Sequence, residues 1–125
     1  MNSDTAMILS TLARPKSRGR IQLRSADPYD HPIIDPRYYS HPDDAKVMLQ
    51  ALKFAQQVVE TPSMQKLSMS LHSTPYSPCD DHQIHSDSYL ECLIDHSSFT
   101  LYHPVGTCKM GREDDPEAVV DPQLK

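Results

Sequence analysis

Apolar residues recur at helical spacing in the middle of the chain. They fall three or four positions apart, which is the period of a helix with one buried face, at Ala45, Met48, Leu49, Leu52, Ala55, Val58 and Val59. Ser40 and Asp43 have capping-box spacing, and Pro42 suits a first helical turn. Thr61-Pro62 ends the pattern. We therefore predict a helix that starts at residues 40–43 and packs its apolar face into a core.

A second, shorter helix is predicted to start at Ser88. Glu91 stands at capping-box spacing from Ser88, and an apolar face follows at Tyr89, Leu90, Leu93 and Ile94. The segment between the two helices, residues 73–85, is rich in Ser, Pro, Asp and His, and this composition predicts a loop.

Three short runs predict strands. Residues 20–24 alternate polar and apolar side chains with period two, whereas residues 6–12 and 99–103 are rich in β-favouring residues. The first two runs are joined by a segment containing Pro and Gly, so we expect them to pair antiparallel. Residues 26–39 hold three Xaa-Pro steps and are expected to be extended coil. Together these elements predict an α+β fold, with an antiparallel sheet flanked by helices.

The composition narrows the class of protein. A chain of 125 residues supports one domain. Its 11 prolines and the absence of tryptophan indicate a small core and many extended, loop-rich segments. The net charge of -5 argues against nucleic acid and anionic membranes as partners. We expect a soluble protein without a transmembrane segment or a secretory signal, its compartment left open. Three cysteines are too few, and too odd in number, for a disulfide framework.

Glycine usage bears on nucleotide binding. The chain has three glycines and no G-x-G-x-x-G pattern. Gly106 and Gly111 have P-loop spacing, but Arg112-Glu113 follows where a P-loop needs Lys and a hydroxyl residue. The sequence therefore shows no phosphate-binding loop of its own.

A cluster of cysteine and histidine is the first candidate for chemistry. It runs Cys79-x2-His82-x2-His85 and then Cys92-x3-His96. If Cys92 and His96 share a helix face, a tetrahedral zinc site is geometrically feasible. The spacing matches no standard zinc pattern, and Cys92 is apolar enough for a core, so we assign no metal.

The second candidate is His103, at the end of the third predicted strand. Pro104 favours an extended backbone at His103, and Gly106 permits a close backbone approach. A neutral imidazole can accept a proton from an alcohol at physiological pH, although a lone histidine at a strand end is also compatible with a structural role. Tyr102 either contacts a substrate or fills the sheet, and Cys108 is expected to be buried.

Several motifs together indicate a family. The run from Tyr102 to Gly111 resembles the histidine motif of the glucose–methanol–choline (GMC) oxidoreductases, nearest to choline dehydrogenase-like and glucose dehydrogenase-like members. The resemblance covers roughly residues 8–125. The other motifs follow in the family's order, at residues 15–25 with Asp27-Pro28, at Pro32-Ile33-Ile34, at residues 39–44 and at residues 119–125.

The resemblance implies an FAD-dependent oxidation of an alcohol, with hydride passed to the flavin and His103 as the base. Residues 1–125 would then form a single partial domain, part of the C-terminal substrate-binding half. The resemblance implies that the FAD-binding Rossmann domain is not among these residues and that the second catalytic position would lie beyond Lys125. We expect that residues 1–125 alone neither hold FAD tightly nor turn over.

Two other hypotheses stay open. One is a truncated, non-catalytic module that binds a partner through open sheet edges. The other is a Cys/His metal-binding module. The sequence leaves the oligomeric state open.

Overall fold

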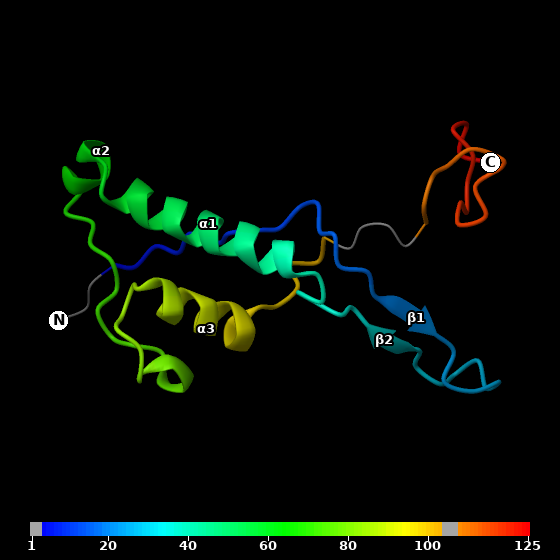
Figure 1. Cartoon of the computed structure of the whole chain (residues 1–125), viewed down its shortest axis with the longest axis horizontal. Coiled ribbons are helices and arrows are strands. Elements are labelled where there is room, and N and C mark those ends of the chain that lie inside the picture. Colours follow the sequence, from blue (N-terminus) through cyan, green and yellow to red (C-terminus); the bar gives the residue numbers. More distant parts are fainter. Residues whose placement is uncertain (1–3, 104–107) are drawn as a thin grey trace.

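Two helices and a two-stranded ribbon organise the chain (Figure 1). The computed structural model describes residues 4–103 and 108–125. Its elements, in order, are β1 (Arg20–Gln22), β2 (Ile33–Asp35), α1 (Pro42–Val59), α2 (Pro62–Gln65), the 3-10 turn η1 (Ser77–Cys79) and α3 (Asp87–Ser97). The antiparallel pair and the helices confirm the predicted α+β class. Among the described residues, no helix has both the length and the apolarity to cross a membrane.

The long helix α1 confirms the first prediction, with a different cap. His41, not Ser40, is the N-cap, and its Nδ1 accepts a hydrogen bond from the Asp43 N–H at 3.2 Å. The Ser40 N–H is already engaged with the Arg37 carbonyl, which closes a turn before the helix. Beyond the end of α1, Pro62 begins the unpredicted α2, because proline suits a first turn as well as it ends a helix.

The N-cap of α3 lies two residues before the predicted Ser88. Ser86 is the N-cap, and its Oγ accepts from the Tyr89 N–H at 3.3 Å, while the Ser88 hydroxyl lies 3.0 Å from the Ser86 hydroxyl. The side chains of Lys53 on α1 and Asp87 on α3 form an ion pair at 2.8 Å. Helix α3 therefore lies along α1 with its N-terminus anchored across the interface (Figure 1).

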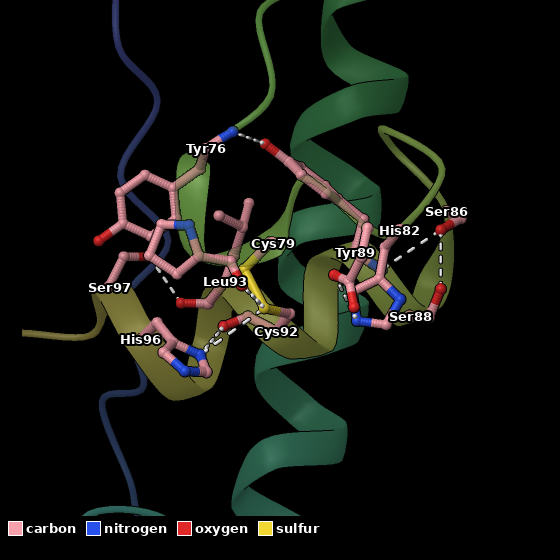
Figure 2. The surroundings of a disulfide bond; sticks show 12 residues. Tyr76, Cys79, His82, Ser86, Ser88, Tyr89, Cys92, Leu93, His96 and Ser97 are labelled. Atoms are coloured by element: carbon pink, nitrogen blue, oxygen red, sulfur yellow. Dashed lines mark hydrogen bonds and ion pairs between the residues drawn. A yellow bond between two sulfur atoms is a disulfide. The ribbon is translucent and has the colours of Figure 1, made fainter.

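The core is small and lies between α1, α3 and η1. Its buried cluster consists of Cys79, Tyr89 and Leu90, against which partly buried residues pack, namely Leu49, Leu52, Ile84, Cys92 and Leu93. Inside the cluster, the Tyr89 hydroxyl accepts a hydrogen bond from the Tyr76 N–H at 3.0 Å (Figure 2). The apolar stripe of α1 thus contributes to the core as predicted.

A disulfide between Cys79 and Cys92 joins η1 to α3 (Figure 2). Their Cα atoms are 5.8 Å apart. From the three cysteines we predict no disulfide framework. That prediction does not anticipate the single disulfide that the structure contains, which leaves one cysteine unbonded. That remaining cysteine, Cys108, is exposed, so the expected burial is wrong.

The ribbon corrects the predicted strand pairing. Strand β1 pairs antiparallel with β2, in the register Arg20↔Asp35, Ile21↔Ile34 and Gln22↔Ile33. Residues 6–12, the expected partner, form no strand. The prolines that predicted coil flank β2 at positions 32 and 36, and they leave the three residues between them able to pair. Residues 99–103 also form no strand.

Gly19 permits the close approach at the start of the ribbon. A Cβ atom at this position would overlap the Asp35 carbonyl oxygen and the Pro36 backbone. The absence of a side chain therefore lets the two strands begin side by side.

Asp44, in the first turn of α1, holds the N-terminal segment on the helix. Its side chain is buried at 2% exposure. It accepts hydrogen bonds from the N–H groups of Lys16 (2.8 Å) and Ser17 (2.7 Å) and from the Ser17 hydroxyl, whose Oγ in turn accepts from the His41 N–H at 3.0 Å. Burial by itself raises the pKa of Asp44, but these hydrogen bonds outweigh it, and the pKa lies below its ordinary value.

We predict that Asp44→Ala lowers the free energy of unfolding by more than about 2 kcal/mol, because two partly buried N–H groups and the Ser17 hydroxyl lose their acceptor. Asp43→Ala is the matched control, since the exposed pair of Asp43 with Lys16 contributes little. Chemical denaturation followed by circular dichroism measures both variants. Equal losses in the two would contradict this role for Asp44.

The same contacts predict a pH dependence. Because the pKa of Asp44 is lowered on folding, its contribution is complete above pH about 4 and is lost as the pH falls through the folded-state pKa. Asp44→Asn should therefore flatten the acid limb of the stability profile.

Candidate functional site

The segment that carries His103 leaves the helix pair at the end of α3. The Ser98 hydroxyl donates to the Ile94 carbonyl at 2.7 Å and lies 2.9 Å from the Tyr39 hydroxyl. These contacts tie the exit of α3 to the segment that precedes α1. They set the point from which residues 99–103 run out to solvent.

His103 and Tyr102 are both exposed, Tyr102 at 89%. The Tyr102 backbone is left-handed, with φ 61°, and its N–H donates to the Thr100 Oγ1 at 3.2 Å. A left-handed conformation is uncommon for a tyrosine, and here it turns the chain immediately before His103. Pro104 and Gly106, on which the sequence argument for His103 also relied, lie outside the described residues.

In residues 108–125, the chain folds back so that segments near its two ends contact each other. Met110 and Val120 form a parallel bridge, and the Val119 N–H donates to the Lys109 carbonyl at 2.8 Å. The Lys109 ammonium pairs with Asp115 at 2.7 Å. This hydrogen bond raises the pKa of Lys109 and lowers the pKa of the Asp115 carboxyl. The second half of the histidine motif therefore begins a compact loop that lies apart from the helix pair (Figure 1).

Two surface hollows occur elsewhere on the described part of the chain. One, of about 480 Å³, lies between residues 11–16 and the first turn of α1. The other, of about 250 Å³, lies between α1 and α3 and is lined by Ala45, Lys46, Leu49, Glu91, Ile94 and Asp95. Neither is lined by Tyr102 or His103. The described residues thus present these side chains at a surface.

The structure brings three members of the cysteine–histidine cluster together and places the other two, His82 and His85, against other residues. Ligand-type atoms of Cys79, Cys92 and His96 lie within 4.8 Å of one another. His82 instead pairs with Asp81 at 3.5 Å, and the His85 ring contacts the edge of Tyr89 with centroids 6.3 Å apart. Because the two cysteines share a disulfide, their sulfurs are not thiolate ligands in this state.

Arg18, in the first family-like motif, contacts the backbone that precedes β1. Its guanidinium donates to the carbonyls of Pro15 (2.6 Å) and Ser17 (3.0 Å). The side chain therefore stabilises the bend before β1.

Sequence comparison identifies the family. Residues 15–125 match the family model of the GMC oxidoreductase C-terminal domain. The match covers most of the chain and contains the segment around His103. The chain therefore belongs to the GMC oxidoreductases, a family of oxidoreductases.

Curated relatives agree with this assignment. Glucose dehydrogenase [FAD, quinone] of Drosophila pseudoobscura is 38% identical over 124 residues, which is 99% of this chain and 20% of the relative. The enzyme of the same name from Drosophila melanogaster is 36% identical over 124 residues, again 99% of this chain and 20% of the relative. Alcohol dehydrogenase [acceptor] of Pseudomonas putida is 45% identical over 112 residues, 89% of this chain and 19% of the relative. The chain thus spans about a fifth of the length of these relatives.

Gly111 offers a test of the loop that follows the histidine motif. A Cβ atom there would lie 2.8 Å from both the Ala118 Cβ and the Asp115 Oδ2. We predict that Gly111→Ala opens the bridge between Met110 and Val120 and speeds amide exchange at Val120. Gly111→Ala with unchanged exchange at Val120 would show that the loop tolerates the methyl group.

Proposed function

We propose that this chain is the substrate-domain portion of an FAD-dependent oxidoreductase acting on CH–OH groups, with His103 as the base. The observation that carries the proposal is the family match over residues 15–125, which includes the motif around His103. Two of the relatives are named glucose dehydrogenase [FAD, quinone] and a third alcohol dehydrogenase [acceptor], and these names support an alcohol or sugar as the substrate.

The fit of the described residues to a flavin is partial. They offer an exposed imidazole and an exposed phenol, and neither of the two hollows described above is lined by these side chains. The sequence has no G-x-G-x-x-G pattern for a dinucleotide phosphate. We infer that these residues supply one wall of the site and that another part of the protein holds the cofactor. Bound FAD would supply the hydride acceptor that no side chain can provide.

His103 has the chemistry that the reaction requires of the protein. Oxidation of an alcohol removes the hydroxyl proton, and a neutral imidazole within hydrogen-bond reach of the hydroxyl can accept it. Because the ring is exposed at the end of a turn, it can meet a substrate presented from a neighbouring surface. Tyr102, beside it, would contact the substrate.

The ribbon supports the inference that residues 1–125 are one partial domain within a larger body. The register partners Ile21 (58% exposed) and Ile34 (66%) share one face, Ile33 (42%) lies on the other, and Leu23 (86%) follows β1 directly. Apolar residues exposed next to one another usually mark a surface that another part of a protein covers. The same exposure favours the second candidate function, a non-catalytic module that binds a partner along the ribbon.

His103→Ala, made in a protein that joins this chain to its flavin-binding part, tests the catalytic proposal. We expect kcat to fall by about 10²-fold or more, because the proton loses its acceptor, while the flavin absorbance is unchanged. His72→Ala, at an exposed histidine of the loop before η1, is the control and should retain full activity. Full activity in His103→Ala would overturn the role of His103 and favour the binding module.

The proposal that another part of the protein holds the cofactor is tested separately. Residues 1–125 alone are expected to lose added FAD during gel filtration, since the phosphate-binding loop is not among them. The absorbance of the eluted protein reports the result. Retention of one flavin per chain would refute the proposal that the cofactor is held elsewhere.

A further inference from the structure

We propose that reduction of the Cys79–Cys92 disulfide creates a zinc site whose protein ligands are Cys79, Cys92 and His96. The site is independent of the proposed oxidoreductase function. Three ligand-type atoms from these residues already lie within 4.8 Å of one another (Figure 2). Two cysteines, one histidine and a water form a ligand set that zinc commonly takes.

The distances suit a tetrahedral ion. With zinc–sulfur and zinc–nitrogen bonds of about 2.3 and 2.0 Å, tetrahedral geometry places sulfur about 3.5 Å from nitrogen and the two sulfurs about 3.8 Å apart. The Cys92 Sγ lies 3.6 Å from the His96 Nδ1. Once the covalent bond is broken, the two sulfurs have to move apart, and the Cys79 Sγ, which lies within 4.8 Å of the His96 ring nitrogen, has to take its place around the ion through side-chain rotation.

The scaffold that places the ligands does not depend on the disulfide alone. Cys92 and His96 stand one turn apart on α3, so they project from one helix face. Cys79 is held at the end of η1 by the bond from its N–H to the Tyr76 carbonyl at 2.8 Å, and Tyr76 is in turn bonded to Tyr89 of α3. These contacts remain when the sulfurs separate.

The ligands also divide the site into a buried and an open side. Cys79 is fully buried and Cys92 half-buried, whereas His96 is exposed. A bound ion would therefore have its sulfur ligands towards the core and a water on the solvent side. To bind zinc, the His96 Nδ1 must give up its 3.0 Å hydrogen bond to the Cys92 carbonyl, which opposes binding.

The chemistry balances with a dithiol as the reductant. The dithiol supplies two electrons and two protons, the Cys79–Cys92 bond breaks into two thiols, and the reductant leaves as its own disulfide. Zinc binding then releases the two thiol protons as the thiolates coordinate the ion. The ion thus replaces a covalent link between η1 and α3 by a coordinate one.

The experiment uses the chain with Cys108→Ser, so that the exposed third thiol does not contribute. The protein is reduced with a phosphine, which leaves as its oxide and does not compete for zinc as a thiol would. Zinc is titrated by calorimetry, and cobalt(II) replaces it for the visible absorption that reports tetrahedral thiolate coordination. The oxidised protein is titrated in parallel, and circular dichroism follows the helices throughout.

We expect one equivalent of zinc in the reduced protein and none in the oxidised protein. His96→Ala should weaken binding by about tenfold or more, and Cys92→Ser should abolish it. His82→Ala, at a histidine of the same cluster that points to Asp81, is the matched control and should change the affinity less than about twofold.

Two results would overturn the site. One is equal zinc affinity in His96→Ala and His82→Ala, which would mean that the thiols bind without the predicted third ligand. The other is a failure of the reduced protein to bind zinc. If reduction melts the helices, their recovery on adding zinc supports the site, and no recovery counts against it.

Discussion

The buried carboxylate of Asp44 is the interaction on which the arrangement of this chain depends. It stands in the first turn of α1 and binds the backbone of Lys16 and Ser17, which are distant in sequence. This contact decides where the N-terminal segment crosses the helix, and therefore where Gly19 and β1 begin. Residues 36–41 connect β2 to α1, so both strands are linked to the same helical turn at one end of the ribbon, and the hairpin loop lies at the other end (Figure 1). Loss of that carboxylate would release the segment around Lys16 and Ser17 from α1.

A second constraint acts on the other side of α1. The loop between α2 and α3 has few apolar residues of its own, and the Cys79–Cys92 bond together with the hydrogen bond from Tyr76 to Tyr89 holds it on α3. A core of this size gains a large share of its stability from such local links, because little apolar area is removed from water. That explains why a single disulfide and one buried carboxylate count for so much here.

The proposed catalytic residue lies outside both constraints. His103 follows a left-handed Tyr102 at the surface, and the tail behind it is closed by Lys109 and its carboxylate partners. A side chain presented in this way suits a site completed by a neighbouring surface. The family match is consistent with an exposed His103 whose site is completed by another part of a longer protein, since the relatives are oxidoreductases about five times as long as this chain.

Local patterns were enough for the two longer helices, α1 and α3, and for the family, because helical periodicity, capping residues and ordered motifs are properties of neighbouring residues; they did not predict α2 or η1. They placed α1 and α3 within two residues and singled out His103. They could not predict that β2 pairs with β1, that residues 6–12 do not, or that Cys79 reaches Cys92. They also missed the role of Asp44, which in sequence is one more acidic residue at a helix start. Each of these depends on contacts between distant segments, and only the tertiary structure decides which segments meet.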